Sequence, residues 1–156
     1  MINQNDSFTN QVKRFHNEIV ELVKKYQFRD RNKRVCCGLS VSQCYIIETL
    51  HRFGPLNMKN LADKMHLSIS TITRVVAPLV KNGFVQREED QKDRRIRLIT
   101  LTQKGQIAFQ QSWQNVFESE KIILGNFPAE HRELLISLLF DLNKAVNQWR
   151  SCCSKR

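Results

Sequence analysis

Long apolar segments are missing from this sequence. The longest apolar run, LLISLLF from Leu134 to Phe140, is far shorter than the roughly 20 residues that a helix needs to span a bilayer. The opening stretch, MINQNDSFTNQ, has no basic region followed by an apolar one, so it lacks the pattern of a secretory signal. We therefore expect a cytoplasmic protein without a transmembrane helix.

Acidic residues are scarce as well. The 156 residues include 15 Asp and Glu against 25 Lys and Arg, which gives a net charge of +10 and a pI of about 9.7. An excess of this size implies an acidic partner, and without a membrane segment the usual candidate is nucleic acid. The 41% of hydrophobic residues suits one compact domain over residues 1–156 with a core of its own.

The cysteines are odd in number. Five cysteines in a reducing compartment argue against a disulfide framework, so we expect thiols. Cys36 and Cys37 follow a basic run and precede an expected helix start, and both features favour the thiolate, which binds soft metals and reacts with oxidants. Neighbouring cysteines form a strained disulfide with each other, so a soft-ion site or a bond to a more distant thiol is the functional hypothesis. The candidate metal or redox residues are Cys36, Cys37, Cys44, Cys152 and Cys153.

Helical periodicity marks the first part of the chain. Apolar side chains recur at helical spacing over residues 7–31. Ser40 and Gln43 have the spacing of a capping box, which predicts that a second helix begins there and ends at the Gly-Pro pair that follows. Leu39 and Cys44 occupy the two positions of a hydrophobic staple around this cap, so Cys44 can equally be a small core side chain.

Two short helical patterns follow, capped by Asn57 and Ser68 and joined by a tight connection. This arrangement predicts a helix-turn-helix whose second helix presents its outer face to a DNA major groove, with Ile69 and Ile72 pointing inward. Small hydroxyl residues let the backbone approach DNA closely, and arginine can bind guanine through two hydrogen bonds. The alternative is a pair of ordinary core helices. The outer face carries Ser70, Thr71, Thr73 and Arg74.

A hairpin is predicted next. FVQRE and IRLITL read as two short strands flanking EDQKDRR, with the basic residues at the tip and on the solvent side, and Ile96 and Leu98 facing inward. A narrow minor groove attracts inserted arginine, so Arg94 and Arg95 at such a tip have a physical use, and Asp93 can hold one of them by a charge-assisted bond. The alternative is a solvated basic edge that discourages aggregation.

Two long helices complete the expected fold. Thr102 can cap a helix over 102–124, and Gly105 allows close packing in its first turn. Apolar residues at helical spacing predict a last helix over 128–150. The expected fold class is mainly α with a small β-hairpin wing.

The stretch LADKMHLSISTITRVVAPLVKNGFVQREEDQKDRRIRLITLTQKG resembles the winged-helix core of the multiple-antibiotic-resistance-regulator (MarR) family, including its Asp-Arg-Arg wing and its Leu-Thr-x-x-Gly exit. The match is most specific over residues 56–105. The resemblance implies a homodimer with a helical dimerisation lobe, 7–31 and 102–150, and a winged helix-turn-helix region, 40–101. Such dimers bind a pseudo-palindromic operator in double-stranded DNA, usually as repressors until a ligand or an oxidant intervenes.

The resemblance also assigns the DNA contacts. Pro78 departs from the family pattern, because a proline inside a helix loses a backbone hydrogen bond and usually bends the helix. The residues that match the family's DNA-binding positions are Ser68, Ser70, Thr71, Thr73, Arg74, Asp93, Arg94 and Arg95.

Several functions fit these patterns. The first is a DNA-binding repressor that needs no resident cofactor and is switched through its thiols by a soft metal, a metalloid or an oxidant. The second is a regulator with structural cysteines that binds aromatic acids in a cleft, as some family members do. A thiol enzyme lacks an evident base and leaves the wing unexplained, so no enzyme activity is expected. An architectural DNA-coating protein differs from a repressor in lacking operator specificity.

Overall fold

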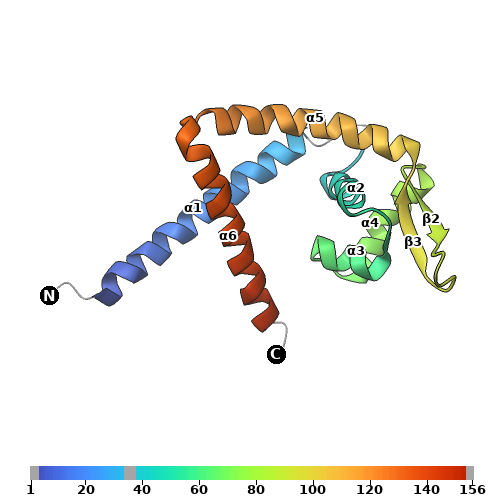
Figure 1. The fold of residues 1–156 in the computed structure, drawn as a ribbon, viewed down its shortest axis with the longest axis horizontal. Helices are drawn as coiled ribbons and strands as arrows, with labels where there is room; N and C mark the ends of the chain where they lie inside the picture. The colour runs from blue at the N-terminus through green and yellow to red at the C-terminus, as the bar shows by residue number, and fades with distance from the viewer. Residues whose placement is uncertain (1–3, 34–37, 154–156) are drawn as a thin grey trace. The chain divides into compact units, whose positions relative to one another are not determined.

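The fold is mainly helical with one small antiparallel sheet, as the sequence predicted (Figure 1). The computed structural model describes residues 4–33 and 38–153 of the chain. Within these ranges, no helix combines the length and the apolar character that crossing a bilayer requires. The elements are α1 (Gln4–Lys33), α2 (Val41–Phe53), β1 (Leu56–Asn57), α3 (Met58–Met65), α4 (Ile69–Lys81), β2 (Val85–Glu89), β3 (Arg97–Leu101), α5 (Gln103–Gly125) and α6 (Ala129–Cys153).

Side-chain caps determine where the short helices begin. At the start of α2, the Ser40 hydroxyl accepts a hydrogen bond from the Gln43 amide at 3.4 Å, and the Gln43 side chain accepts one from the Ser40 amide at 2.8 Å. At the start of α3, the Asn57 side chain accepts from the Asn60 amide at 2.8 Å. The predicted capping box and the predicted Asn57 cap are therefore confirmed.

One hydrophobic core joins α2, α3, α4, the sheet and the beginning of α5. Leu39 and Cys44, the two predicted staple residues, are each only 3% exposed and belong to this core. The largest fully buried side chains are Ile46, Ile47, Leu61, Ile72, Val76, Leu79, Val85 and Ile99.

The helix α4 differs from expectation in its first turn and continues past its proline. Ile69 was expected to point inward, and this is wrong because it is 52% exposed. It lies two helical turns before the buried Val76 and so on the same side of the helix, but the core does not reach this first turn. Pro78 does not end the helix, which continues to Lys81.

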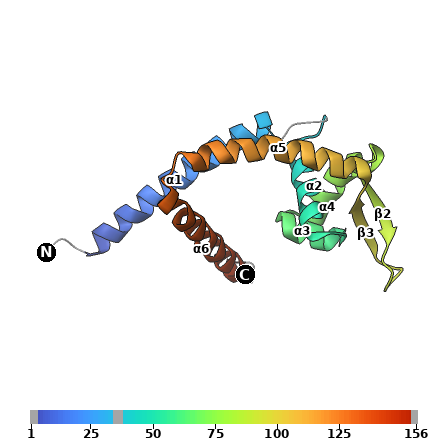
Figure 2. The ribbon, with the colours of Figure 1, turned by 45° about the horizontal axis from the view of Figure 1, so that its top comes forward.

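The sheet has the strand order β1-β3-β2 with both pairs antiparallel, so β3 is the central strand. The predicted hairpin of β2 and β3 is present, and Figure 2 shows it extending away from α2, α3 and α4. The sequence did not predict β1, a strand of two residues that pairs Leu56 with Ile99. So short a segment has no alternation of its own and becomes a strand only because β3 lies beside it.

The sequence predicted the wrong set of inward-pointing side chains for β3. Ile96 and Leu98 were expected to point inward, whereas Ile99 is fully buried and Ile96 is 36% exposed. The run IRLITL has apolar residues at both odd and even positions, so alternation alone cannot choose which face meets the core. Tertiary packing makes that choice here.

The start of α5 is tied to the end of α4 and the start of β2. The Thr102 hydroxyl accepts a hydrogen bond from the Gly105 amide at 3.1 Å and donates to the Gly83 carbonyl at 2.6 Å. A Cβ atom at Gly105 would lie only 2.1 Å from the Phe84 carbonyl oxygen. The predicted cap and the predicted close packing are both confirmed.

Two compact units divide the chain, one ending at Val116 and the other beginning at Phe117, within α5. The first unit contains the hydrophobic core. In the second unit, made of the end of α5 and α6, none of the side chains that the structure describes is buried. The helix α1 extends beyond the predicted 7–31 at both ends, and α6 extends beyond the predicted 128–150 at its C-terminal end, because apolar periodicity marks a contact face rather than the last hydrogen-bonded turn.

Candidate nucleic-acid interface

The first turn of α4 brings hydroxyl side chains together on the surface. The Ser68 hydroxyl accepts a hydrogen bond from the Thr71 amide at 3.2 Å, lies 2.8 Å from the Thr71 hydroxyl and 2.9 Å from the Ser70 hydroxyl. One side chain therefore caps the helix and orders its two neighbours. Amides in the first turn of a helix carry partial positive charge, which suits a phosphate oxygen.

The next turn of α4 carries Thr73 and Arg74, both exposed. The Thr73 hydroxyl donates to the Ile69 carbonyl at 2.8 Å, so its only hydrogen is used within the helix. Arg74 makes no hydrogen bond or ion pair with any residue in 4–33 or 38–153, and its guanidinium is therefore available to an external acceptor. All five predicted α4 residues thus lie on one short stretch of surface.

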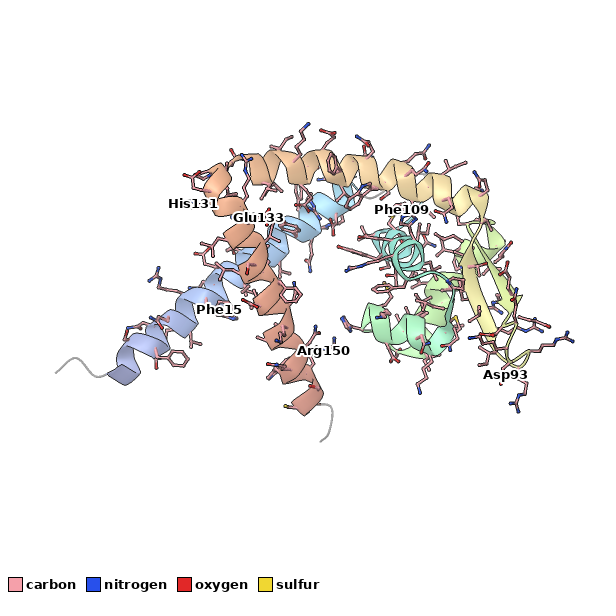
Figure 3. All side chains as sticks on the ribbon, viewed as in Figure 1. Phe15, Asp93, Phe109, His131, Glu133 and Arg150 are labelled. Atoms are coloured by element: carbon pink, nitrogen blue, oxygen red, sulfur yellow. The ribbon has the colours of Figure 1, made fainter. Side chains whose placement is uncertain are left out.

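The wing is built around the Asp93 carboxylate, which Figure 3 labels near the far end of the hairpin. It accepts two hydrogen bonds from the Arg95 guanidinium, at 3.0 Å and 3.1 Å, and one from the Arg95 amide at 3.0 Å. Asp90 orders the other side of the turn by accepting from the Lys92 amide at 2.7 Å. These bonds confirm that Asp93 holds one of the two tip arginines.

The same contact sets the ionisation of the pair. Hydrogen bonds from the Arg95 side chain, and then from its backbone, hold the pKa of the Asp93 carboxyl below its ordinary value. The Asp93 carboxylate in turn raises the pKa of Arg95. Both groups therefore stay charged at neutral pH.

The cations of the wing differ in what they bind. Arg95 is paired with Asp93, and Arg97 is paired across the hairpin with Glu89 at 2.9 Å. Arg94 is exposed and forms no polar contact with the part of the chain that the structure describes. The wing therefore presents one oriented arginine and one unpaired arginine.

Comparison with known proteins agrees with this geometry. Residues 39–96, which include all eight predicted DNA-binding residues, match the MarR family. The uncharacterized HTH-type transcriptional regulator YxaD of Bacillus subtilis (strain 168) is 27% identical over 136 residues, covering 87% of this chain and 95% of that protein. The winged helix-turn-helix region is therefore similar to that of MarR-family regulators.

Two further proteins are similar to this chain. The HTH-type transcriptional repressor YetL of Bacillus subtilis (strain 168) is 28% identical over 118 residues, covering 72% of this chain and 69% of that protein. A MarR family protein from Bacillus stearothermophilus has the same fold, with a TM-score of 0.81 at 21% identity, covering 89% of this chain and 97% of that one. The relatives similar in sequence are named as transcriptional regulators, which favours a regulator over a thiol enzyme.

The cysteines of this chain lie in different surroundings. Cys44 is buried in the core of the first unit, and Cys152 is exposed near the end of α6. Cys36 and Cys37 lie outside the described residues, and Cys153 is the last residue of α6. Among the residues described, no three His, Cys, Asp or Glu side chains form a group that could hold a metal ion. The thiol site stays a prediction.

An aromatic stack that the sequence did not indicate joins α2 to α5. The His51 ring stacks on Phe109 with centroids 3.8 Å apart, and Phe109 in turn faces Trp113 at 6.2 Å. A hollow of about 610 Å³ lies here, lined also by Glu48 and Arg52. No local pattern in the sequence indicates this contact, because Phe109 lies far along the chain from His51.

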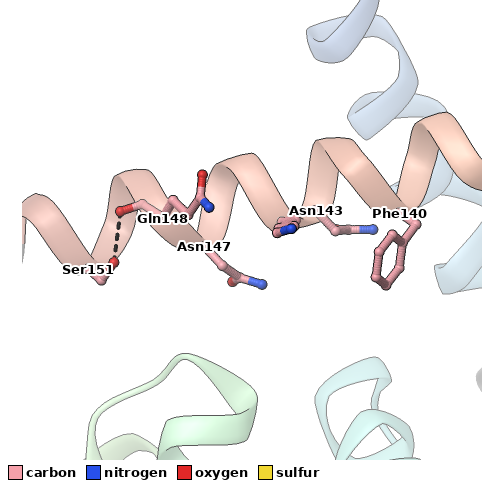
Figure 4. Close-up of a pocket in the computed structure, with 6 residues that line it drawn as sticks. Phe140, Asn143, Asn147, Gln148 and Ser151 are labelled. Carbon is pink, nitrogen blue, oxygen red and sulfur yellow. Dashed lines mark hydrogen bonds between the residues drawn. The ribbon is translucent and has the colours of Figure 1, made fainter.

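The second unit has two hollows of its own. One, of about 360 Å³, lies between the end of α5 and α6 and is mostly apolar. The other, of about 510 Å³, lies along α6 (Figure 4), where the Ser151 hydroxyl donates to the Gln148 carbonyl at 2.8 Å. The side chains that line it are polar or aromatic: Phe140, Asn143, Lys144, Asn147, Gln148 and Ser151.

Proposed function

We propose that this protein is a cytoplasmic homodimeric repressor of the MarR family that binds a pseudo-palindromic operator in double-stranded DNA. Each subunit places α4 in a major groove and the β2–β3 wing in the neighbouring minor groove. One observation carries the proposal: two exposed arginines, Arg74 on α4 and Arg94 on the wing, are not used by the part of the fold that the structure describes.

The major-groove contact follows from the chemistry of α4. Arg74 can bind the O6 and N7 acceptors of guanine through two hydrogen bonds. Ser68 and Ser70, at the start of the helix, are suited to a phosphate, which would set the register of the helix on the duplex. Thr73 has its hydroxyl hydrogen bonded to Ile69, which leaves its methyl group to contact a thymine methyl.

The minor-groove contact follows from the wing. A narrow minor groove concentrates negative potential and attracts arginine. The pairing of Arg95 with Asp93 orients that side chain before DNA arrives, which lowers the entropy lost on binding. Arg94 adds a charge that nothing on the described chain neutralises.

The dimer is supported by apolar surface on the outer helices. A soluble monomer rarely exposes many large apolar side chains on the same helices, and a two-fold dimer is the usual way to bury them. Side chains that are at least 46% exposed on α1 and α6 include Phe8, Val12, Phe15, Leu134, Leu138, Phe140, Val146 and Trp149.

Operator binding is tested by selecting sequences from a random DNA pool and measuring the affinity of variants for the selected site. Arg74→Ala and Arg94→Ala should each weaken binding by about 1–3 kcal/mol. The Arg94 variant should also make the dependence of affinity on salt shallower, since a phosphate-proximal charge is lost. Arg14→Ala, which makes the same change in net charge on α1, is the control and should bind like the native protein.

Two results would refute the proposal. If the pool yields no preferred sequence, binding is architectural and the protein is not an operator-specific repressor. If both arginine variants bind the selected site with native affinity and native salt dependence, α4 and the wing are not the DNA-binding surface.

A small organic acid is the second candidate effector, and the aromatic stack favours it. Phe109 and Trp113 offer ring faces, and the neighbouring Arg52 offers a cation that could pair with a carboxylate. Because the hollow joins α2 to α5, a ligand there could change the orientation of the winged region. Ligand-dependent release of DNA that is abolished by Trp113→Ala would support this effector over the thiols.

The thiols are the first candidate effector site. Cys36 and Cys37 follow a basic run in the sequence, and Cys152 is exposed in the second unit, so soft ions and oxidants can reach at least this last thiol. A soft metal, a metalloid or a disulfide that joins the two cysteine pairs would favour one spacing of the two winged regions over another. Cys44, buried in the core, is better suited to packing than to sensing.

A further inference from the structure

The helix α1 makes an unusual contact with the winged region. Among its side chains described by the structure, residues 7–32, only one is buried, and that residue is an acid: Asp30 is 5% exposed. The apolar side chains of α1 in this range are half-buried or exposed, as is Phe15 at 53%. The buried attachment of α1 is therefore polar.

Both oxygens of the Asp30 carboxylate are engaged. Oδ1 accepts hydrogen bonds from the neighbouring Arg29 guanidinium, at 2.6 Å and 3.1 Å, while Oδ2 accepts from the hydroxyl of Tyr45 on α2. The Arg29 guanidinium also lies over the Tyr26 ring, 4.2 Å from its centroid, which holds it from the other side. Asp30 is thus presented by α1 in a fixed position.

The backbone of Tyr45 is held firmly on the side of the winged region, while its side chain is 36% exposed. Tyr45 follows Cys44 and precedes Ile46, and both of these neighbours are buried in the core. A displacement of the Tyr45 backbone would have to move α2 with it. The Tyr45–Asp30 hydrogen bond therefore connects α1 directly to the rigid core that carries α4 and the wing.

A polar contact of this kind acts differently from an apolar one. Apolar surfaces can slide over one another with little loss of energy, whereas a hydrogen bond to a charged acceptor requires one geometry, and a buried carboxylate without its partner is costly. The contact therefore selects one orientation of α1 against the winged region.

We propose that the Asp30–Tyr45 hydrogen bond is a positioning contact that determines which spacing of operator half-sites the protein recognises. The inference rests on the proposed function, in which α1 belongs to the dimerisation lobe. If that lobe relates the two subunits, the orientation of each winged region against α1 sets the separation of the two α4 helices. One added or removed base pair changes the separation of half-sites by about 3.4 Å and also rotates one against the other.

The test compares Tyr45→Phe with the native protein on the selected operator and on versions whose half-sites are one base pair closer or farther. The native protein should strongly prefer one spacing. Loss of one charge-assisted hydrogen bond should reduce this preference by about tenfold or more, through weaker binding at the native spacing and relatively stronger binding at the altered ones. Asp30→Asn, which keeps an acceptor oxygen but no charge, should give a smaller loss.

Thr49→Val is the matched control. It also removes one hydroxyl from α2, but that hydroxyl bonds only within the winged region, to the Tyr45 carbonyl at 2.8 Å and the Met65 sulfur at 3.3 Å. It should keep the native spacing preference. Binding to a single half-site, measured for all variants, reports whether α4 and the wing are still folded and should not change.

The outcomes separate the inference from the function on which it rests. A native protein that discriminates spacings and a Tyr45→Phe variant that discriminates them equally well would overturn the positioning role alone. A native protein that shows no spacing preference would refute the proposal that a dimer binds two half-sites of the operator. It would refute the positioning role as well. An equal loss in Thr49→Val would show that any change in α2 has this effect, and would also overturn the role of the Asp30–Tyr45 contact.

Discussion

Gly105 lies so close to Phe84 that a Cβ atom at residue 105 would come within 2.1 Å of the Phe84 carbonyl oxygen. The obstacle is backbone rather than a flexible side chain, so α5 would have to move away from the beginning of β2. Gly105→Ala should therefore lower the free energy of unfolding by about 1–3 kcal/mol, as measured by urea denaturation.

A second glycine of α5 provides the control for that measurement. A Cβ atom at Gly125 would meet no atom within 4 Å of it. Gly125→Ala should leave the stability unchanged or raise it by up to about 1 kcal/mol, because alanine has the higher helix propensity. Equal destabilisation by the two substitutions would mean that the contact with Phe84 is not what excludes a side chain at Gly105.

Ser68 and Ser40 cap two helices in the same way but should differ in their effect on DNA. Ser68→Asp and Ser40→Asp should both keep the native thermal midpoint, because aspartate is a good cap and its charge suits a helix N-terminus. Only Ser68→Asp should weaken operator binding strongly, since it adds a negative charge where α4 is proposed to approach phosphates. Native affinity in Ser68→Asp would contradict that placement of α4.

The wing ion pair should respond to pH only in strongly acidic solution. The pKa of the Asp93 carboxyl is lowered below its ordinary 3.8, so the pair is fully formed above that pH and is lost as the pH falls through the lower value in the folded protein. An NMR titration of the Asp93 side chain should give a midpoint below 3.8. Arg95→Ala should return this midpoint toward 3.8, while Arg94→Ala should leave it in place, because only Arg95 is bonded to Asp93.

The proposed dimer predicts twice the 18.4 kDa chain mass in light scattering at micromolar concentration. Leu138→Glu, which places a charge on the exposed apolar surface of α6, should weaken dimerisation by about 2 kcal/mol or more without unfolding the winged region. Lys144→Glu changes charge on the polar hollow of the same helix and should remain dimeric. A monomeric native protein that still binds a palindromic site tightly would contradict the assembly.

The thiol hypothesis predicts that arsenite or cadmium releases operator DNA from the native protein. To change occupancy from 99% to 1%, the effector must favour the released state by about 5.5 kcal/mol, which ligation by several thiolates can supply. Serine at both Cys36 and Cys37 should abolish release but not DNA binding, whereas Cys44→Ala should still respond. If the double serine variant releases DNA like the native protein, the effector belongs in the hollow beside Phe109 instead.

The local architecture and the chemical character of the protein can be predicted without a structure. Caps such as Ser40 with Gln43, and Thr102 ahead of Gly105, depend on residues within one helical turn, so spacing alone reveals them. The wing could be predicted for the same reason, since its turn residues lie between two strand-like runs. The net charge of +10 requires no structure, and it already indicated a nucleic-acid partner.

Which side chains are buried or paired depends instead on contacts between distant segments of the chain. The burial of Ile99 rather than Ile96, the pairing of β1 with β3 and the stacking of His51 on Phe109 all join segments that are distant in the chain. From the sequence alone, Asp30 would be predicted to be a solvent-exposed charged residue of a helix. In the structure it is buried and accepts a hydrogen bond from Tyr45. Burial depends on what lies opposite a side chain, and periodicity in one segment does not contain that information.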